Sequence, residues 1–237
     1  MSLLYLIRHG QASFGADNYD KLSPMGIKQA CVLGAHLADI GVVPDAVYSG
    51  AMSRQMHTAE DVRRCYRERG IIVPELVLKN GLNEFDSSSI IISQLPEMQE
   101  QDPLLAEHLP RMYESRESFK RIFEGAMLRW VSGAFDKPGV ESWKDFSARV
   151  SLSITQIMEE QGKGKNVFIF TSGGPIAAAL QFVLNLSPET AIRLNWQIVN
   201  TSYAKFMYNA GRITMACFNC TAHLELEQEK SALISYR

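Results

Sequence analysis

A histidine between an arginine and a glycine is the residue pattern with the clearest chemical meaning in this sequence. Arg8-His9-Gly10 directly follows the apolar run of residues 3–7. A neutral imidazole is a nucleophile, and a neighbouring guanidinium binds phosphate and keeps the ring neutral by lowering its pKa. The pattern indicates phosphoryl transfer to His9, and a structural core histidine is the alternative interpretation.

Two residues elsewhere in the chain carry groups that such a reaction needs. Arg54 lies at the start of a predicted helix, where free backbone N–H groups and the helix dipole attract an anion. Together with Arg8, it can bind a phosphate through charge-assisted hydrogen bonds. Glu84 lies in a predicted loop after the strand-like residues 71–78 and can protonate a leaving oxygen. A solvated loop carboxylate is the alternative interpretation of Glu84.

Three short apolar segments predict the elements that bring these residues together. The segments are residues 3–7, 46–48 and 167–170, and the helical patterns after them span 24–40, 53–69 and 175–186. Short, continuously apolar strands that alternate with helices predict a three-layer α/β/α sandwich around a mostly parallel sheet. Ligands bind at the carboxyl ends of such strands. The residues expected to converge there are Arg8, His9, Arg54, Ser172 and Gly173.

The middle of the chain has a different, helical pattern from about residue 96 to residue 138. One apolar stripe comprises Phe119, Ile122, Phe123, Met127 and Trp130, and a second comprises Trp143, Phe146, Val150, Ile154 and Ile157. Such stripes are typical of helices that pack on a core. We interpret residues 1–237 as a single domain with a helical insertion at about 95–140, which is placed to roof the site.

Composition excludes several classes of partner. Lys and Arg number 24 and Asp and Glu 26, so the formal charge of −2 lacks the basic surplus of a nucleic-acid-binding protein. The uncharged stretch 166–188 is interrupted by Thr171-Ser172-Gly173-Gly174-Pro175, which predicts strand, loop and helix rather than a membrane span. The first residues lack the pattern of a signal peptide. We expect a cytoplasmic protein without a nucleic-acid or membrane partner.

Cys217 and Cys220 have the spacing of a redox or zinc motif, and His223 follows closely. No second pair completes a tetrahedral zinc site, and the motif does not open a helix after a strand. We therefore interpret the cysteines as inert thiols and predict neither a metal nor a cofactor.

An ordered set of motifs resembles the histidine phosphatase superfamily, which includes cofactor-dependent phosphoglycerate mutases and many broad phosphatases. The matching segments are residues 6–12, 22–30, 48–59, 82–84, 140–150, 200–202 and 218–224. Arg-His-Gly by itself is a weak signal, whereas the whole set in this order is specific. The resemblance implies a phosphoglycerate-mutase-like fold with a helical insertion.

The resemblance also implies a mechanism. His9 attacks phosphorus and becomes a phosphohistidine, Arg8 and Arg54 hold the transferring oxygens, and Glu84 protonates the leaving alcohol and then activates water. No metal takes part. Ser172 departs from the pattern, because the family normally has a second histidine there. A hydroxyl donates one hydrogen bond without charge, and losing a charged donor costs about 2–4 kcal/mol.

The sequence therefore predicts a metal-independent phosphatase that hydrolyses a phosphate monoester, on a phosphorylated small molecule or phosphoprotein, through a phosphohistidine at His9. Two alternatives stay open: a weakly active or inactive phosphate-ligand binding or interaction protein, and a phosphoglycerate-mutase-type phosphotransferase. Ser172→His is expected to raise turnover. His223 is the remaining histidine whose motif approaches the site. Substrate identity and oligomeric state are not assigned.

Overall fold

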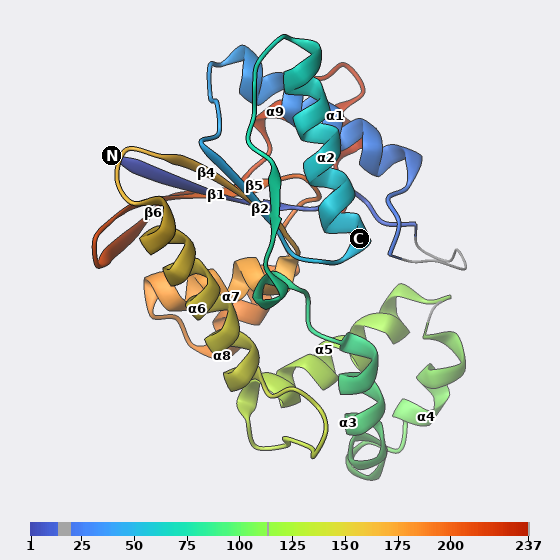
Figure 1. The fold of residues 1–237 in the computed structure, drawn as a ribbon. Coiled ribbons are helices and arrows are strands. Elements are labelled where there is room, and N and C mark those ends of the chain that lie inside the picture. The colour runs from blue at the N-terminus through green and yellow to red at the C-terminus, as the bar shows by residue number, and fades with distance from the viewer. Residues whose placement is uncertain (14–19, 113, 237) are drawn as a thin grey trace.

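The protein is built on a six-stranded sheet with the order β3-β2-β4-β1-β5-β6. The computed structural model describes residues 1–237 except 14–19, 113 and 237 (Figure 1). The strands are β1 (Ser2–Arg8), β2 (Ala46–Ser49), β3 (Leu76–Leu78), β4 (Asn166–Thr171), β5 (Tyr203–Asn209) and β6 (Arg212–Cys220). β1 pairs in parallel with β4, β4 with β2, and β2 with β3, whereas β5 is antiparallel to both β1 and β6. The sheet is therefore mostly parallel, as predicted.

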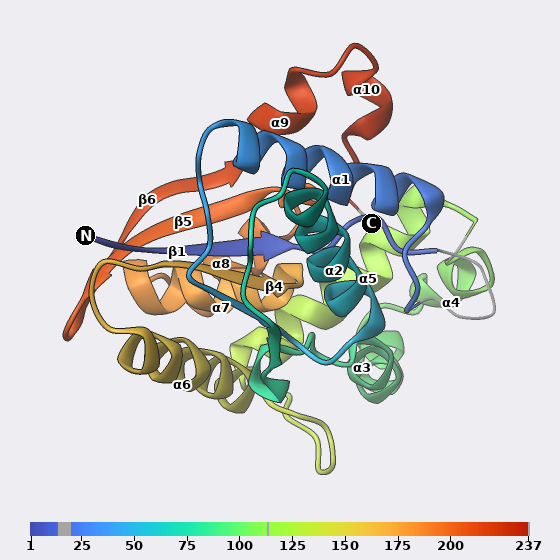
Figure 2. The same ribbon diagram turned by 45° about the horizontal axis from the view of Figure 1, so that its top comes forward.

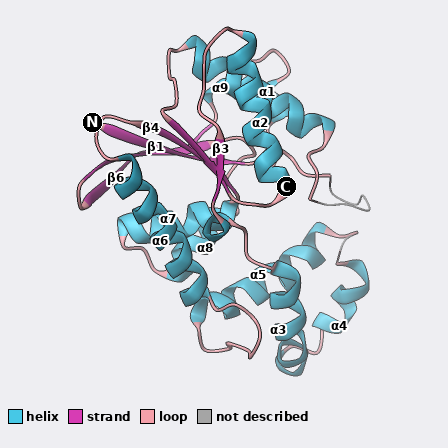
Figure 3. Ribbon diagram, viewed as in Figure 1, coloured by secondary structure: helices cyan, strands magenta, loops and turns pink. Residues whose placement is uncertain are grey.

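Helices cover both faces of this sheet (Figure 3). The longer ones are α1 (Pro24–Asp39), α2 (Ser53–Glu68), α3 (Ser87–Gln101), α5 (Arg116–Ser132), α6 (Trp143–Gln161), α7 (Gly173–Leu184) and α8 (Pro188–Asn195). The short ones are η1 (Asn80–Leu82), α4 (Leu105–His108), η2 (Leu109–Arg111), α9 (Ala222–Glu225) and α10 (Lys230–Leu233). The predicted α/β/α sandwich is confirmed.

The side-chain alternation of β1 explains why both faces need a helical layer. Leu4 and Leu6 belong to one core, which α6 and α7 help to form, and Tyr5 and Ile7 belong to a second core against α1 and α2. Successive residues of a strand point to opposite faces, so a continuously apolar strand requires cover on both. This burial fixes the register of β1 and thereby the position at which Arg8 and His9 leave the sheet.

Local capping signals decide where the helices begin. Ser23 accepts a hydrogen bond from the N–H of Gly26, and Pro24 occupies the first position of α1, where its missing N–H has no consequence. The helix predicted from Pro96 instead begins at Ser87, because Asp86 caps it through the N–H of Ser89. Pro96 lies inside α3.

Two further sequence expectations meet different outcomes. The uncharged stretch 166–188 forms β4 and then α7, as predicted. The strand expected over residues 71–78 is confined to β3, because Pro74 has no N–H to donate to a sheet ladder. No helix in the described part of the chain is both long and apolar enough to span a membrane.

Helices α3, α4 and α5 lie beyond the carboxyl end of β1 in both Figure 1 and Figure 2. Ile122, Met127 and Trp130 of α5 are fully or almost fully buried in the core that also contains the α6 stripe. Because β1 ends at Arg8, this helical segment is on the side of the sheet where the predicted phosphate site lies.

Candidate active site

Four segments that are distant in the sequence meet at the carboxyl ends of β1, β2 and β4. The N–H of His9 donates to the carbonyl oxygen of Thr171 at 2.8 Å, which joins the end of β1 to that of β4. Arg54 Nε donates to His9 Nε2 at 3.1 Å, and the N–H of Gly174 donates to Glu84 Oε2 at 3.1 Å. The structure thus brings His9, Arg54 and Glu84 to the same end of the sheet as Ser172.

The hydrogen bonds of His9 determine which ring nitrogen carries a proton. An arginine can only donate, so Nε2 accepts from Arg54 and holds a lone pair. Nδ1 lies 2.7 Å from the carbonyl oxygen of Gly10 and is therefore the protonated nitrogen. Burial lowers the pKa of His9 well below its usual range, and the charges of Arg54 and Arg8 lower it further. The ring is neutral, with its lone pair on Nε2.

The backbone around His9 is held on both sides. Asn200, which is fully buried, donates from Nδ2 to the carbonyl oxygen of His9 at 3.0 Å. The N–H of Gly10 donates to Thr58 Oγ1 at 3.0 Å, one helical turn after Arg54. Thr201, with φ of 59°, directs its N–H to the carbonyl oxygens of Arg8 and His9. The backbone that carries the imidazole is therefore held by two separate segments, α2 and the turn at residues 200–201.

Asp20 orients Arg54 and was missed by sequence reasoning. Its Oδ1 lies 2.7 Å from Arg54 Nη1, and its Oδ2 accepts from the N–H of Ser53 at 2.7 Å. The carboxylate thus binds both a guanidinium and the N-terminus of α2, the combination expected to attract an anion. No motif or periodicity of the sequence marks Asp20, so its role emerges from the tertiary structure alone.

Arg8 occupies a different position from Arg54. Its Nη1 donates to the carbonyl oxygen of Ile198, and its Nη2 donates to that of Tyr236 at 2.9 Å. Its charge nevertheless acts on the site, because it lowers the pKa of His9 and opposes the rise in the pKa of Glu84. The structure places the Arg8 guanidinium against the backbone of Ile198 and of the C-terminal segment.

Glu84 lies where burial favours its protonated form. Burial raises the pKa of its carboxyl group, although hydrogen bonds from the N–H groups of Gly174 and Phe85 and the charges of Arg54 and Arg8 oppose the shift. Phe85, the next residue, packs against Trp130 with ring centroids 4.8 Å apart, and against Phe146 at 5.5 Å. The aromatic cluster therefore anchors the acid loop to α5 and α6.

Hydrogen bonds from two other segments brace the same loop. Arg149 of α6 donates from Nη1 to the carbonyl oxygens of Gly81 and Asn83, at 3.0 and 2.8 Å. Asn83 Oδ1 accepts from the N–H of Ala51 at 2.6 Å, which ties the loop to the turn before α2. The carboxyl group of Glu84 is consequently held on the same framework as Arg54.

The two glycines after Ser172 leave room for side chains of the site. A Cβ on Gly173 would lie 2.1 Å from Asn195 Oδ1, and a Cβ on Gly174 would lie 2.0 Å from Glu84 Oε1. Ser172 itself is fully buried, and its Oγ accepts a hydrogen bond from Gln55 Nε2 at 2.8 Å. Gln55 is a second residue of the site that sequence reasoning missed, although it directly follows Arg54.

Gly174→Ala is expected to displace Glu84 without unfolding the protein. The new methyl group would lie 2.0 Å from Oε1, at the far end of the glutamate side chain, and 2.6 Å from the Phe85 ring, so both side chains would have to shift. We expect kcat/KM for an alkyl phosphate to fall roughly 100-fold, as expected for loss of a general acid. Gly125→Ala is the control, because its methyl group would meet the end of the Met98 side chain. Equal activity of the two variants in a steady-state assay would contradict this role of Gly174.

His223 does not stand beside Ser172 as the missing second histidine. It is buried, its Nε2 lies 3.1 Å from Thr201 Oγ1, and its ring is 6.4 Å from that of Tyr203 and 6.1 Å from that of His36. Burial, assisted by His36, lowers the pKa of His223 to about 3. His223 therefore supports the backbone behind His9 through Thr201, as a neutral group.

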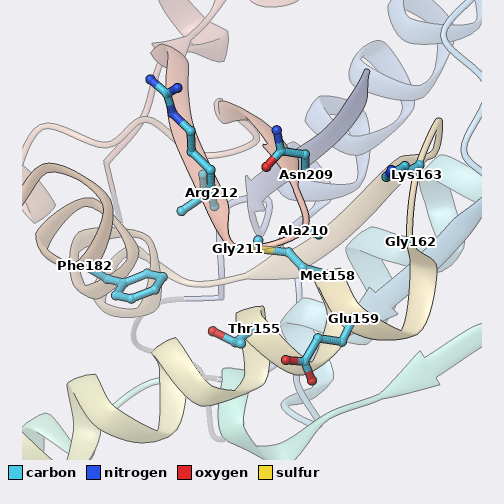
Figure 4. Close-up of a pocket in the computed structure, with 11 residues that line it drawn as sticks. Thr155, Met158, Glu159, Gly162, Lys163, Phe182, Asn209, Ala210, Gly211 and Arg212 are labelled. Carbon is cyan, nitrogen blue, oxygen red and sulfur yellow. The ribbon is translucent and has the colours of Figure 1, made fainter.

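Other features of the molecule lie apart from this site. A cavity of about 320 Å³ is lined by α6, α7 and the β5–β6 turn, including Met158, Phe182 and Arg212 (Figure 4). Tyr208, next to this turn, pairs with Ser2, so the cavity lies at the amino end of β1, opposite His9. Cys217 and Cys220 are unbridged on β6. Within the described ranges, no three His, Cys, Asp or Glu side chains are grouped to hold a metal ion.

Comparison with known proteins identifies the family of the chain. A model of the histidine phosphatase superfamily (branch 1) matches residues 4–103 and 86–221. The chain belongs to the histidine phosphatase superfamily. The 2,3-bisphosphoglycerate-dependent phosphoglycerate mutase of Bradyrhizobium diazoefficiens is 24% identical over 199 residues, which are 81% of this chain and 85% of that protein.

Two solved structures share the fold of this chain. Phosphoserine phosphatase from Entamoeba histolytica, solved as a mutant with phosphoserine, superposes with a TM-score of 0.64 and 19% identity, covering 94% of this chain and 100% of that one. Phosphoglycerate mutase from Bacillus anthracis gives a TM-score of 0.62 and 18% identity, covering 94% of each chain. The phosphoglycerate-mutase-like fold inferred from the sequence is confirmed. The superfamily includes both phosphatases and phosphotransferases.

Proposed function

We propose that the protein is a phosphatase that hydrolyses a phosphate monoester through a phosphohistidine at His9. The observation that carries this proposal is the state of the imidazole: its Nδ1–H donates a hydrogen bond to the carbonyl oxygen of Gly10, and its Nε2, which holds the lone pair, accepts from Arg54 Nε at 3.1 Å. An incoming phosphate accepts the N–H of Arg54, so the lone pair is released beside the phosphorus that it attacks. Arg54 thus couples substrate binding to exposure of the nucleophile.

Glu84 completes the proposed reaction. In the first step the Nε2–P bond forms, the P–O bond to the alcohol breaks, and protonated Glu84 gives its proton to the leaving oxygen. In the second step the Glu84 carboxylate takes a proton from water as that water attacks phosphorus, and the P–N bond breaks. Phosphate leaves, His9 is neutral again and Glu84 is protonated again. The cations Arg8 and Arg54 stabilise the charge on the phosphoryl oxygens.

Labelling that is stopped with alkaline detergent tests the proposal directly. Purified protein mixed with a radiolabelled aryl phosphate is expected to form an adduct that is labile in acid and stable in base, and to release phosphate in the presence of a chelator. His9→Ala is expected to lose both the adduct and the turnover. His57→Ala is the matched control, because His57 is exposed on α2. Turnover that survives His9→Ala, or that requires a metal ion, would overturn the mechanism.

Two competing functions have a specific observation behind them. Ser172 in place of a charged residue favours a phosphate-binding protein without turnover, which would bind vanadate but never form the adduct. The curated mutase relatives favour a phosphotransferase. When 3-phosphoglycerate is added, a mutase would transfer the label to its free hydroxyl instead of releasing phosphate, so analysing the labelled products by chromatography separates these functions.

A further inference from the structure

Gln55 stands at the centre of the candidate site without being one of its predicted residues. It is fully buried in the first turn of α2, directly after Arg54. Its Nε2 donates to Ser172 Oγ at 2.8 Å and to the carbonyl oxygen of Leu82 at 3.4 Å. Ser172 precedes α7, and Leu82 precedes the loop of Glu84. One amide group therefore links the three segments that carry the site.

The orientation of this amide follows from its neighbours. The atom beside Ser172 is also close to the carbonyl oxygen of Leu82, which accepts a hydrogen bond from Thr171 Oγ1 at 2.7 Å. A carbonyl oxygen placed there would face another carbonyl oxygen, so the atom is the NH₂ group and donates. Ser172 Oγ is consequently an acceptor in its contact with Gln55.

This contact determines where the hydroxyl proton of Ser172 points. A serine hydroxyl has one proton and two lone pairs, and Gln55 occupies one lone pair. The side chain does not cap α7. In the described part of the chain, no acceptor for its proton lies within hydrogen-bond distance. The hydroxyl, next to Thr171 whose carbonyl binds His9, is left with a proton to donate to an incoming anion.

Packing alone does not account for a glutamine at this position. Its Oε1 is buried and has no hydrogen-bond partner among the residues that the structure describes, and an unsatisfied buried oxygen destabilises a folded protein. The chain also makes room for it, because a Cβ on Gly50 would lie 2.0 Å from Oε1. A methionine of similar length would fill the same volume without an unsatisfied oxygen. The amide is thus explained by what its NH₂ group does to Ser172.

We propose that Gln55 is a positioning residue, which holds the Ser172 hydroxyl so that its O–H donates a hydrogen bond to a non-bridging oxygen of the transferring phosphoryl group. The proposal rests on the function proposed above. Gln55 and Ser172 together supply a neutral hydrogen-bond donor at the position where the superfamily resemblance leads one to expect a charged histidine. Gln55 acts through Ser172 and does not itself contact the phosphoryl group.

A double-mutant cycle on kcat tests this coupling. Gln55→Met keeps the length of the side chain and removes the donor, and Ser172→Ala removes the hydroxyl. We expect each single variant to lower kcat for p-nitrophenyl phosphate about 10-fold with little change in KM, the pattern of a lost transition-state contact. The double variant is expected to be no slower than Ser172→Ala. Gln94→Met, which removes a buried glutamine of α3, is the control for loss of a buried amide.

The outcomes separate the proposal from its alternatives. If Gln55→Met lowers kcat by the same factor in the wild-type and Ser172→Ala backgrounds, or does not lower it, the positioning role is wrong. If thermal unfolding shows that Gln55→Met is not folded, Gln55→Glu replaces it. The carboxylate would accept a hydrogen bond from the Ser172 hydroxyl and so turn it away from the phosphoryl group, and the same non-additive losses of kcat are expected.

If the wild-type protein has no phosphatase activity, the proposed function is wrong, but the proposed role of Gln55 toward Ser172 is still open to test. The cycle is then measured as the Kd for vanadate, to which the Ser172 hydroxyl would donate in the same way, and non-additive losses of affinity support the role of Gln55. Additive losses of vanadate affinity, or no binding of vanadate by the wild-type protein, would overturn it.

Discussion

Glu84→Gln is expected to slow the hydrolysis of an alkyl phosphate by roughly 100- to 10,000-fold, because an amide cannot protonate the leaving alkoxide. The loss for p-nitrophenyl phosphate is expected to be much smaller, since nitrophenolate leaves without a proton. Glutamine has the shape of glutamic acid, and its amide can still accept from the N–H of Gly174. The measurement is kcat/KM for glycerol phosphate and for p-nitrophenyl phosphate with the same two proteins.

The pH profile gives a second test of Glu84. Burial raises the pKa of its carboxyl group, so the acid form persists to higher pH than in an exposed glutamate. Hydrolysis of the alkyl ester is expected to fall as pH rises through that pKa, and Glu84→Gln is expected to lose this limb. The acid limb, set by protonation of His9, is expected well below the usual histidine range. Equal losses for both esters, or an unchanged alkaline limb in Glu84→Gln, would exclude Glu84 as the acid.

The backbone of the site was predictable from sequence because sheet geometry leaves little choice. Apolar runs that end in Arg8-His9 and in Ser49 have to be buried strands, and parallel strands bring their carboxyl ends to one edge. That rule is sufficient to bring His9, Arg54 and Ser172 together before any side chain is placed. The aromatic residue after Glu84 is a sequence signal for a loop that packs on the core, because Phe85 is buried and contacts Trp130.

The side-chain partners were not predictable in the same way. Asp20 meets Arg54, and Gln55 meets Ser172, across contacts that depend on rotamers and on the exact position of α2. Arg8 lies at the expected strand end, but its guanidinium is directed to backbone carbonyls that sequence patterns do not identify. Capping can also outweigh a proline. Asp86 caps α3, which begins at Ser87, nine residues before the start at Pro96 that the sequence pattern predicted. Patterns of polarity therefore predict elements, and packing decides side-chain pairs.

The structure changes the expectation for Ser172→His. Gln55 Nε2 is 2.8 Å from Ser172 Oγ, so an imidazole built in the direction of the hydroxyl would overlap the amide. The single substitution is therefore expected to leave kcat unchanged or lower it, in contrast to the rise predicted from the sequence. Removing the obstruction with Gln55→Ala provides the volume that the ring requires, beside Gly50 and Leu82.

The combined variant Gln55→Ala/Ser172→His is expected to raise kcat for p-nitrophenyl phosphate by roughly 100-fold over the wild-type protein. An imidazolium replaces a neutral donor to the transferring oxygens, and one such charged contact is worth about 2–4 kcal/mol. The phosphate dianion favours the imidazolium, so the gain should shrink as pH rises through the pKa of the new ring. Gln55→Ala alone, with Ser172 retained, is expected to be slower than wild type and serves as the control. A folded combined variant that is no faster than this control would show that the present site cannot use a second histidine, and that its geometry is matched to the neutral pair of Gln55 and Ser172.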